Sequence, residues 1–341
     1  MPIEKAVLLV NLGTPDAPTS KKVRTYLNEF LSDPRVIDIN AVGRWLLLHL
    51  FILPFRPKKS AALYRKIWSS AGSPLLEHTR LLTEKLKARM PAHIEIDFVM
   101  RYGNPSIDSV IAKLMAQSPQ ELVVMPLYPQ YASSSTGSTL EAIYKILSKK
   151  WNVPAIRTVV PFYRHPQFLD AIIAIGRPLL QSFQPDFILF TYHGLPERQI
   201  RKSECTPDFC LKADNSCCAS ITNKNGYCYR AQCFETTRQL ADRLALSPNQ
   251  YSTAFQSRLG RTPWIKPYAD VVIEELAKQG KKKVLVFSPS FVADCLETLE
   301  EISIRGQKTF TDAGGEKLLL VPSLNSSEAW ANAVEKILFP A

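Results

Sequence analysis

The sequence predicts an α/β fold made of two similar Rossmann-like domains, each a parallel sheet flanked by helices. Three observations support this prediction. Short apolar segments alternate with segments of helical length, and motifs of the first half recur in the second half in the same order. The chain also has 341 residues, more than one typical domain of about 100–150 residues contains.

The predicted strands are short, largely apolar runs, as is typical of parallel strands covered on both faces. They are residues 6–10, 94–99, 122–125, 187–190 and 284–287. Segments of helical length lie between them, at residues 75–88, 106–116, 139–149, 236–244 and 271–278. A strand, a turn and a helix repeated in this way indicate a parallel sheet.

The two halves of the chain match at three points, which occur in the same order. The matched pairs are residues 7–15 with 188–196, 101–103 with 258–260, and 125–126 with 288–289. Ordered matches indicate a duplicated domain. We expect a first domain over residues 1–165, a second over 166–325, and a C-terminal helix in 326–341 that packs back on the first. A ligand is then expected between the domains, at the carboxyl ends of the strands.

The charge balance favours an anionic partner. Lys and Arg number 42 against 31 Asp and Glu, for a net charge of +11. The basic residues are scattered and form no nucleic-acid-binding motif, so an acidic small molecule or a membrane surface is expected instead. The longest apolar stretch, residues 45–54, is interrupted by His49 and is shorter than the ~20 residues of a membrane span. With no secretory signal, a cytoplasmic protein is expected, with peripheral membrane association left open.

His193 is the first candidate for chemistry. It follows a predicted buried strand and precedes Gly194-Leu195-Pro196, so the turn presents it at the carboxyl end of the sheet. A histidine there can accept a proton near neutral pH or bind a metal. The alternative is a histidine that only stabilises its turn.

The segment 291–301 is the second candidate, because it follows the last predicted strand-to-helix turn. If it is helical, Asp294, Glu297 and Glu301 lie on one face. Such a row can carry cations or protons. Acidic residues also favour the first turn of a helix, so a capped and solvated helix is the alternative.

Taken together, these segments closely resemble the ferrochelatase family, in the family's order and over nearly the whole chain. The motifs that carry the resemblance are residues 9–15, 126–131, 192–196, 255–258 with Trp264, and 294–301. The resemblance implies a lyase that inserts Fe²⁺ into protoporphyrin IX to give protohaem, the terminal step of haem biosynthesis. It implies that His193 and Glu297 face each other across the porphyrin, with Glu301 behind Glu297. Whether His193 is a proton acceptor, a ligand to the iron substrate or both is left open.

The resemblance also implies positions around the porphyrin substrate. Arg101, Tyr102 and Trp264 match pocket positions, whereas Arg56 and Ser73 match positions that contact the propionates, where guanidinium–carboxylate pairing is apt. Leu12 stands where members that use coproporphyrin often have tyrosine, which favours protoporphyrin IX.

Two further segments match features of the family. Cys295 replaces a histidine found in some members, so a metal path through that imidazole is in doubt here. Residues 45–56 correspond to an apolar lip over the pocket mouth. This lip either covers the porphyrin or touches a membrane surface.

Six of the seven cysteines lie in an expected insertion, residues 203–233. Disulfides, a structural zinc ion and an iron–sulfur cluster are the three alternatives for them. The resemblance to members with an internal cysteine segment favours a [2Fe–2S] cluster. Its candidate ligands are Cys205, Cys210, Cys217, Cys218 and Cys228.

Other functions remain as alternatives. They are a coproporphyrin ferrochelatase, a cobalt or nickel chelatase acting on a related tetrapyrrole, and a non-catalytic haem or iron–sulfur sensor on the same fold. Retention of both His193 and Glu297 argues against the sensor. The oligomeric state is not predicted by the sequence.

Overall fold

The computed structural model describes residues 3–260 and 262–340. They form two compact units. Unit 1 contains Met1–Tyr128, Ser133–Val160 and Glu335–Ala341, and unit 2 contains Pro129–Ala132 and Pro161–Val334. The change from unit 1 to unit 2 thus falls slightly before the expected residue 165, and the end of the C-terminal helix α12 (Glu328–Leu338) is grouped with unit 1.

The sheet of unit 1 has four parallel strands in the order β2-β1-β3-β4. The strands are β1 (Lys5–Gly13), β2 (Ile94–Tyr102), β3 (Glu121–Pro126) and β4 (Ala155–Thr158). Residues 6–10 of the central strand β1 are completely buried, which explains their continuous apolar sequence. Gly13 ends β1 at φ +125°, where a Cβ atom would lie 1.9 Å from the Tyr102 carbonyl oxygen, so only glycine fits this approach of β1 to β2.

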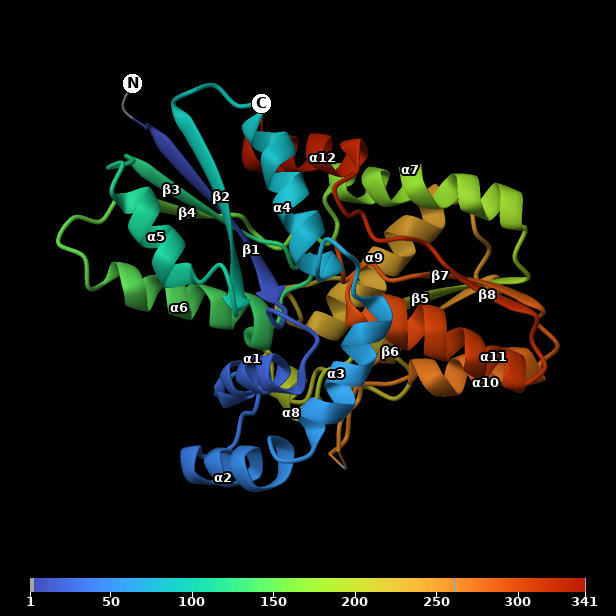
Figure 1. Ribbon diagram of the computed structural model, residues 1–341. Helices are drawn as coiled ribbons and strands as arrows, with labels where there is room; N and C mark the ends of the chain where they lie inside the picture. The colour runs from blue at the N-terminus through green and yellow to red at the C-terminus, as the bar shows by residue number, and fades with distance from the viewer. Residues whose placement is uncertain (1–2, 261, 341) are drawn as a thin grey trace. The chain divides into compact units, whose positions relative to one another are not determined.

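Helices cover both faces of this sheet (Figure 1). Helix α4 (Pro74–Lys87) packs on one face, and α5 (Ile107–Met115) and α6 (Ser138–Leu147) pack on the other. Beyond the carboxyl ends of β1 and β2 lie the remaining helices of unit 1. These are α1 (Ser20–Ser32), α2 (Ala41–Leu46), the π-helix η1 (Leu47–Ile52) and α3 (Arg56–Ile67).

The sheet of unit 2 also has four parallel strands, in the order β6-β5-β7-β8. The strands are β5 (Phe187–His193), β6 (Tyr251–Gln256), β7 (Lys283–Phe287) and β8 (Lys317–Leu320). In both sheets the first strand of the unit pairs with the second and the third, and the fourth strand lies outermost. This identical order confirms the predicted pair of Rossmann-like domains.

Helices also cover both faces of the second sheet. Helices α7 (Pro166–Phe183) and α9 (Tyr229–Arg243) lie on one face. On the other face α10 (Ala269–Lys278), the π-helix η4 (Leu296–Gly306) and α11 (Gln307–Asp312) enclose an apolar core with β5, β6, β7 and β8. The short α8 (Glu197–Lys202) and the 3₁₀ turn η3 (Ser216–Cys218) lie between β5 and α9 in sequence.

The acidic segment differs from the prediction. It forms a π-helix that begins at Leu296, with Cys295 as its N-cap, so Asp294 lies outside the helix. The Asp294 carboxylate accepts hydrogen bonds from the Thr298 hydroxyl (3.0 Å) and the Asn325 amide (2.8 Å). The predicted row of three carboxylates on one helical face is therefore wrong for Asp294, which stabilises the start of η4. Glu297 and Glu301 do lie within η4, as the prediction of a helix requires.

Candidate active site

His193 is the last residue of β5, at the carboxyl end of the sheet in unit 2, as predicted. Its backbone N–H donates to the Ser290 hydroxyl at 3.2 Å. Its Nδ1 lies 2.6 Å from the Gly194 carbonyl oxygen. Because a carbonyl oxygen only accepts, Nδ1 carries the ring proton in this contact, and Nε2 of the neutral ring has its lone pair available for a proton or a metal ion.

Gln256, the last residue of β6, and Ser257, which follows it, hold the acidic π-helix. The Gln256 side-chain amide donates to the Glu297 carbonyl oxygen (2.8 Å) and lies 3.5 Å from the Glu301 carboxylate. The Ser257 backbone N–H donates to Glu301 at 2.8 Å, and its hydroxyl donates to the other oxygen of the same carboxylate. Both oxygens of Glu301 are therefore fixed. The sequence suggested no such role for Ser257, because it depends on a contact between β6 and η4.

The histidine and the acidic helix are connected through β6. His193 pairs with Gln256 in the parallel register of β5 and β6, and the Gly194 N–H donates to the Gln256 carbonyl oxygen at 2.7 Å. Since Gln256 also binds the backbone of Glu297, the structure brings the three predicted catalytic residues, His193, Glu297 and Glu301, to one end of one sheet. π-helical segments occur frequently at functional sites, which fits this position of η4.

Cys295 belongs to the same region. Its thiol is buried and forms a hydrogen bond with Glu297. Burial, together with the nearby Glu297 charge, raises the pKa of the Cys295 thiol well above its usual value. Cys295 is therefore a neutral thiol that contacts the carboxylate, and it does not reproduce the imidazole found in some relatives.

Trp264 lies in a loop that runs alongside the His193 turn. Trp264 pairs with Pro196 in an isolated β-bridge, and the Ile265 N–H donates to the Leu195 carbonyl oxygen at 3.0 Å. A surface pocket of about 480 Å³ opens beside it, with two aromatic and two basic side chains in its lining: Trp264, Tyr268, Arg258 and Lys266. An apolar, anionic ligand suits such a lining.

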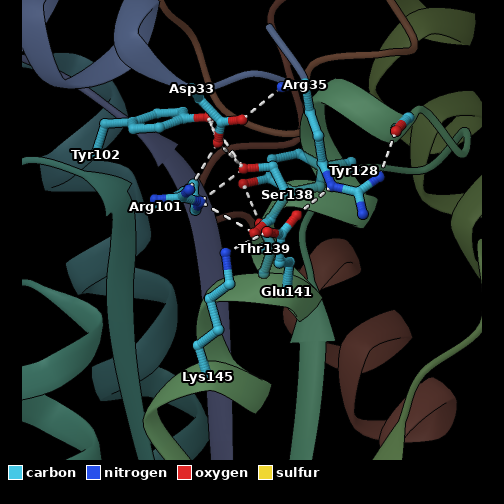
Figure 2. A network of polar contacts seen from close by, with 10 residues as sticks. Asp33, Arg35, Arg101, Tyr102, Tyr128, Ser138, Thr139, Glu141 and Lys145 are labelled. Atoms are coloured by element: carbon cyan, nitrogen blue, oxygen red, sulfur yellow. Dashed lines mark hydrogen bonds and ion pairs between the residues drawn. The ribbon is translucent and has the colours of Figure 1, made fainter. Parts of the chain in front are cut away.

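In unit 1, Arg101 and Tyr102 end β2 in a buried polar network that Figure 2 shows. The Asp33 carboxylate accepts from the Arg101 guanidinium (2.7 Å), the Tyr102 hydroxyl (2.9 Å) and the Ser138 hydroxyl (2.5 Å). The Arg101 Nε also donates to the Ser138 hydroxyl at 2.7 Å, and its guanidinium stacks on the Tyr102 ring at 4.4 Å. Arg101 is thus rigidly held, and Tyr102, with 1% of its surface exposed, helps to hold it.

The other predicted substrate residues of unit 1 lie at element ends. Ser73 is the buried N-cap residue of α4, and its hydroxyl accepts from the Thr14 hydroxyl at 2.8 Å. Leu12 lies near the end of β1 and is half-buried. Arg56 is the first residue of α3 and is also half-buried. Contacts of these three residues with a porphyrin stay predictions.

The predicted lip spans the end of α2, all of η1 and the start of α3. Five of its large apolar side chains are exposed, Trp45, Leu46, Leu50, Phe51 and Phe55, the last two by 67% and 68%, whereas Leu48 and Leu53 are buried. An exposed apolar patch of this kind marks a binding surface. In residues 3–260 and 262–340, no helix is both long and apolar enough to span a bilayer.

Four of the predicted cluster ligands are buried together in the insertion of unit 2. They are Cys210, Cys217, Cys218 and Cys228. The sulfur atoms of Cys217 and Cys218 are 3.8 Å apart, and the Cys228 thiol forms hydrogen bonds with both Cys218 and Cys210. The hydrogen bond from Cys228 lowers the pKa of the Cys210 thiol.

The fifth candidate ligand, Cys205, is exposed, and the buried Cys233 forms a hydrogen bond with Tyr229. Among the described residues, no group of three or more His, Cys, Asp or Glu side chains has an arrangement that could hold a metal ion. The four thiols contact one another directly instead.

Comparison with known proteins shows similarity over the whole chain. A family model described as "Ferrochelatase" matches residues 4–340. A protein named ferrochelatase from Coxiella burnetii (strain CbuG_Q212) is 47% identical over 331 residues, covering 97% of this chain and 92% of that protein. A ferrochelatase from Legionella pneumophila (strain Lens) is 44% identical over 340 residues, covering 98% of this chain and 99% of the relative.

Solved structures show the same fold at low sequence identity. SirB from Bacillus subtilis with Fe³⁺ has a TM-score of 0.55 and 12% identity, covering 98% of this chain and 96% of that chain. The sirohydrochlorin chelatase SirB from Bacillus subtilis subspecies spizizenii, in complex with cobalt, has a TM-score of 0.54 over the same shares. These two structures support the fold alone. The family model and the relatives from Coxiella and Legionella show that the chain belongs to the ferrochelatase family.

Proposed function

We propose that this enzyme inserts Fe²⁺ into protoporphyrin IX to give protohaem, the terminal step of haem biosynthesis, as a lyase that needs no electron transfer. The observation that carries the proposal is the joint placement of His193 and the two carboxylates of η4 at one end of the second sheet. Porphyrin metallation removes two pyrrole protons and delivers a desolvated cation. Those steps require a base and carboxylates, which this end of the sheet supplies.

The proposed roles follow from the local geometry. His193 offers the lone pair of Nε2 to a pyrrole proton or to the incoming iron, because Nδ1 is engaged with the Gly194 carbonyl. Glu297 acts at the opposite side of the ring, and Glu301 relays protons or iron toward it. Arg56, Ser73, Arg101, Tyr102, Trp264 and Leu12 are proposed to contact or support the porphyrin, whose propionates suit the excess of basic residues.

An anaerobic metallation assay tests the reaction. Purified protein is given Fe²⁺ with either protoporphyrin IX or coproporphyrin, and haem formation is followed by its absorption. We expect the larger kcat/KM with protoporphyrin IX, because Leu12 replaces the tyrosine typical of coproporphyrin users. A preference for coproporphyrin would reassign the substrate. Metallation of a more reduced tetrapyrrole with Co²⁺ or Ni²⁺ alone would favour the cobalt or nickel chelatase.

We also propose that Cys210, Cys217, Cys218 and Cys228 hold a [2Fe–2S] cluster. The proposal rests on the donor chemistry of four buried thiols, in which Cys228 contacts Cys210 and Cys218, and Cys218 contacts Cys217; thiolates are the soft ligands that such a cluster requires. Because iron insertion transfers no electrons, the cluster has a structural or redox-sensing role. Elemental analysis and acid-labile sulfide in freshly purified, anaerobic protein test this proposal. A colourless protein with zinc instead would indicate a structural zinc site.

We further propose that the protein is cytoplasmic and that its lip, residues 45–56, contacts a membrane surface transiently. Exposed Phe51 and Phe55 are followed in the sequence by the basic Lys58 and Lys59, a combination that suits an anionic lipid surface. Sedimentation with phosphatidylserine vesicles tests this contact. Binding should weaken in the double variant Phe51→Ser and Phe55→Ser. Equal recovery of both proteins in the supernatant would leave the lip as a cover for the porphyrin.

A further inference from the structure

The outer strands of the two sheets differ in how their free edges are covered. Strands β4 and β8 hold the same place in the duplicated sheets, and within the described chain each pairs with one neighbouring strand. On the free side of β8, the Leu318 N–H donates to the Gln307 side-chain oxygen at 2.8 Å, and the Leu318 side chain is only 3% exposed. Helix α11, which begins at Gln307, therefore covers the edge of β8.

The edge of β4 has no such cover. The N–H groups of Ala155 and Val159 donate to carbonyl oxygens on the β3 side, at 3.0 and 2.8 Å. Successive residues of a strand direct their backbone groups to opposite sides, so the N–H groups of Ile156 and Thr158 face away from β3. Neither N–H has a hydrogen-bond partner in residues 3–260 and 262–340. Ile156, the second residue of β4 as Leu318 is of β8, is 36% exposed. Unpaired main-chain groups along an uncovered edge are a template for a further strand.

Exposed apolar and basic side chains lie in the turn that leads from α6 into β4. Trp151 is 100% exposed, and Val153 is exposed as well. Lys149 and Lys150 directly precede Trp151, and their exposed side chains form no ion pair with any described residue. Residues 142–160 contain four Lys or Arg and no Asp or Glu. The surface that leads into β4 therefore offers apolar contacts and uncompensated positive charge, which suit an acidic partner.

We propose that the edge of β4 docks an extended, acidic segment of a partner protein, which adds to the first sheet as a further strand. Main-chain carbonyl groups of that segment accept from the N–H groups of Ile156 and Thr158, and its acidic side chains pair with Lys149 and Lys150. A second copy of this chain suits the edge less well, because two such edges would bring the same lysines together. A lipid surface offers no row of backbone acceptors in the register of a strand.

A defined peptide probe tests the docking. A fluorescein-labelled peptide of alternating glutamate and valine is titrated into the full-length protein, and its anisotropy gives the Kd. Amide hydrogen exchange of residues 155–159 is measured with and without the peptide. We expect saturable binding, slower exchange at Ile156 and Thr158, and weaker binding as salt is added. A peptide of alternating lysine and valine should bind at least about tenfold more weakly.

Two variants separate the main-chain contacts from the charge. Ile156→Pro removes one outward N–H, and proline is tolerated on an edge strand where its nitrogen faces solvent. The double variant Lys149→Glu and Lys150→Glu reverses the charge. Each should weaken binding of the glutamate peptide about tenfold. Ile156→Ala keeps the N–H and should lose less affinity than Ile156→Pro. The double variant Lys282→Glu and Lys317→Glu is the matched control, because it makes the same change in net charge beside the covered edge of β8, and it should bind like wild type.

Several results would overturn the docking of an acidic strand. They are the absence of peptide binding, equal affinity for the two peptides, and a folded Ile156→Pro variant with wild-type affinity. If Ile156→Pro does not fold, wild-type affinity in the Lys149→Glu and Lys150→Glu variant overturns it instead. Sedimentation with phosphatidylserine vesicles that is lost in Trp151→Ser, without peptide binding, would assign this surface to lipid. Dimerisation that protects residues 155–159 in the absence of peptide would assign it to a second copy of the chain.

Discussion

Ser257 holds Glu301 by both carboxylate oxygens, one through its backbone N–H and the other through its hydroxyl. To do so it adopts a φ of +66°, which is uncommon for a residue other than glycine and costs energy. Strain of this kind at the end of β6 is offset by the two hydrogen bonds to a charged acceptor, which are stronger than bonds between neutral groups. Ser257 thus fixes the orientation of the Glu301 carboxylate.

The first prediction separates the hydroxyl of Ser257 from its backbone strain. Both Ser257→Ala and Ser257→Gly lose the hydroxyl, so we expect kcat for iron insertion to fall about tenfold in each, as for the loss of ~1.4 kcal/mol of stabilisation. Only glycine relieves the positive φ, so its variant should be about 1 kcal/mol more stable than the alanine variant. Steady-state kinetics and urea unfolding measure the two effects. Unchanged kcat in both variants would remove Glu301 orientation from the mechanism.

The second prediction concerns the two histidines at element ends of unit 2. His193→Ala should fold normally, because the ring is partly exposed and its Nδ1 bonds only the adjacent Gly194 carbonyl. Its metallation rate should fall by at least ~10²-fold, as expected for a removed general base. His165 is the matched control, because it caps α7 through its ring nitrogen. His165→Ala should lose about 0.5–2 kcal/mol of stability but keep its rate. Near-normal turnover of His193→Ala contradicts the proposed role.

The strands that were predicted correctly are mostly those whose apolar sequence follows directly from burial on both faces of the sheet. Strands β1, β3, β5 and β7 contain continuous apolar runs because both faces of the sheet are covered, and β2 was predicted although Glu95 and Asp97 interrupt its apolar run. The outer strands β4, β6 and β8 were not predicted, since Ala155–Thr158 and Tyr251–Gln256 contain polar residues and β8 is only four residues long.

The site was predictable where a single residue follows a predicted strand, as His193 does. Asp33 and Ser257 were missed because their roles come from hydrogen bonds to residues far away in the sequence: Asp33 binds Arg101 and Ser257 binds Glu301. No local pattern reports such contacts. The start of η4 was misplaced because the tertiary partner of Asp294, Asn325, lies in another segment.

The third prediction concerns the stability of unit 1. Asp33→Asn removes the charge that pairs with Arg101 in a buried network, so the guanidinium loses its counter-charge. Breaking a buried pair from one side typically costs about 3–5 kcal/mol, and we expect a loss in that range by urea unfolding. Glu84→Gln is the control, because Glu84 pairs with Arg80 on the surface. The loss of unfolding free energy in Glu84→Gln should stay below about 1 kcal/mol. Equal effects of the two substitutions would show that the network contributes little to folding.

The fourth prediction is a pH dependence. Hydrogen bonds from Lys145 and then Arg35 lower the pKa of Glu141 from 4.5 to about 2. Because the folded pKa lies below the unfolded one, the stabilisation is complete above pH 4.5 and is lost as the pH falls toward 2. The Glu141→Gln variant has no carboxylate at this position and therefore lacks this pH-dependent stabilisation. The wild type should therefore be more stable than this variant by about 0.5–1 kcal/mol at pH 7, since the pairs are partly exposed, and the difference should vanish near pH 2.

Glu274→Gln serves as the control for that measurement. Glu274 forms an ion pair with the exposed Lys278 on α10, whereas Glu141 forms ion pairs with both Lys145 and Arg35. Its effect at pH 7 should stay below about 0.5 kcal/mol. Thermal unfolding at several pH values gives both differences. A Glu141→Gln difference that does not change between pH 5 and pH 2 would mean that the ion pairs do not act through protonation of Glu141.

The fifth prediction distinguishes the buried cysteines from the exposed one. Cys228 contacts both Cys210 and Cys218, so Cys228→Ser removes the sulfur atom that connects the group. We expect this variant to purify with less than about a tenth of the wild-type metal and without visible absorption, because serine oxygen is a poor ligand for a soft iron–sulfur centre. Cys205→Ser should keep the metal, since Cys205 is exposed whereas Cys228 is buried. Metal loss in Cys205→Ser and retention in Cys228→Ser would reverse the ligand assignment, because it would show that the insertion rearranges around the metal.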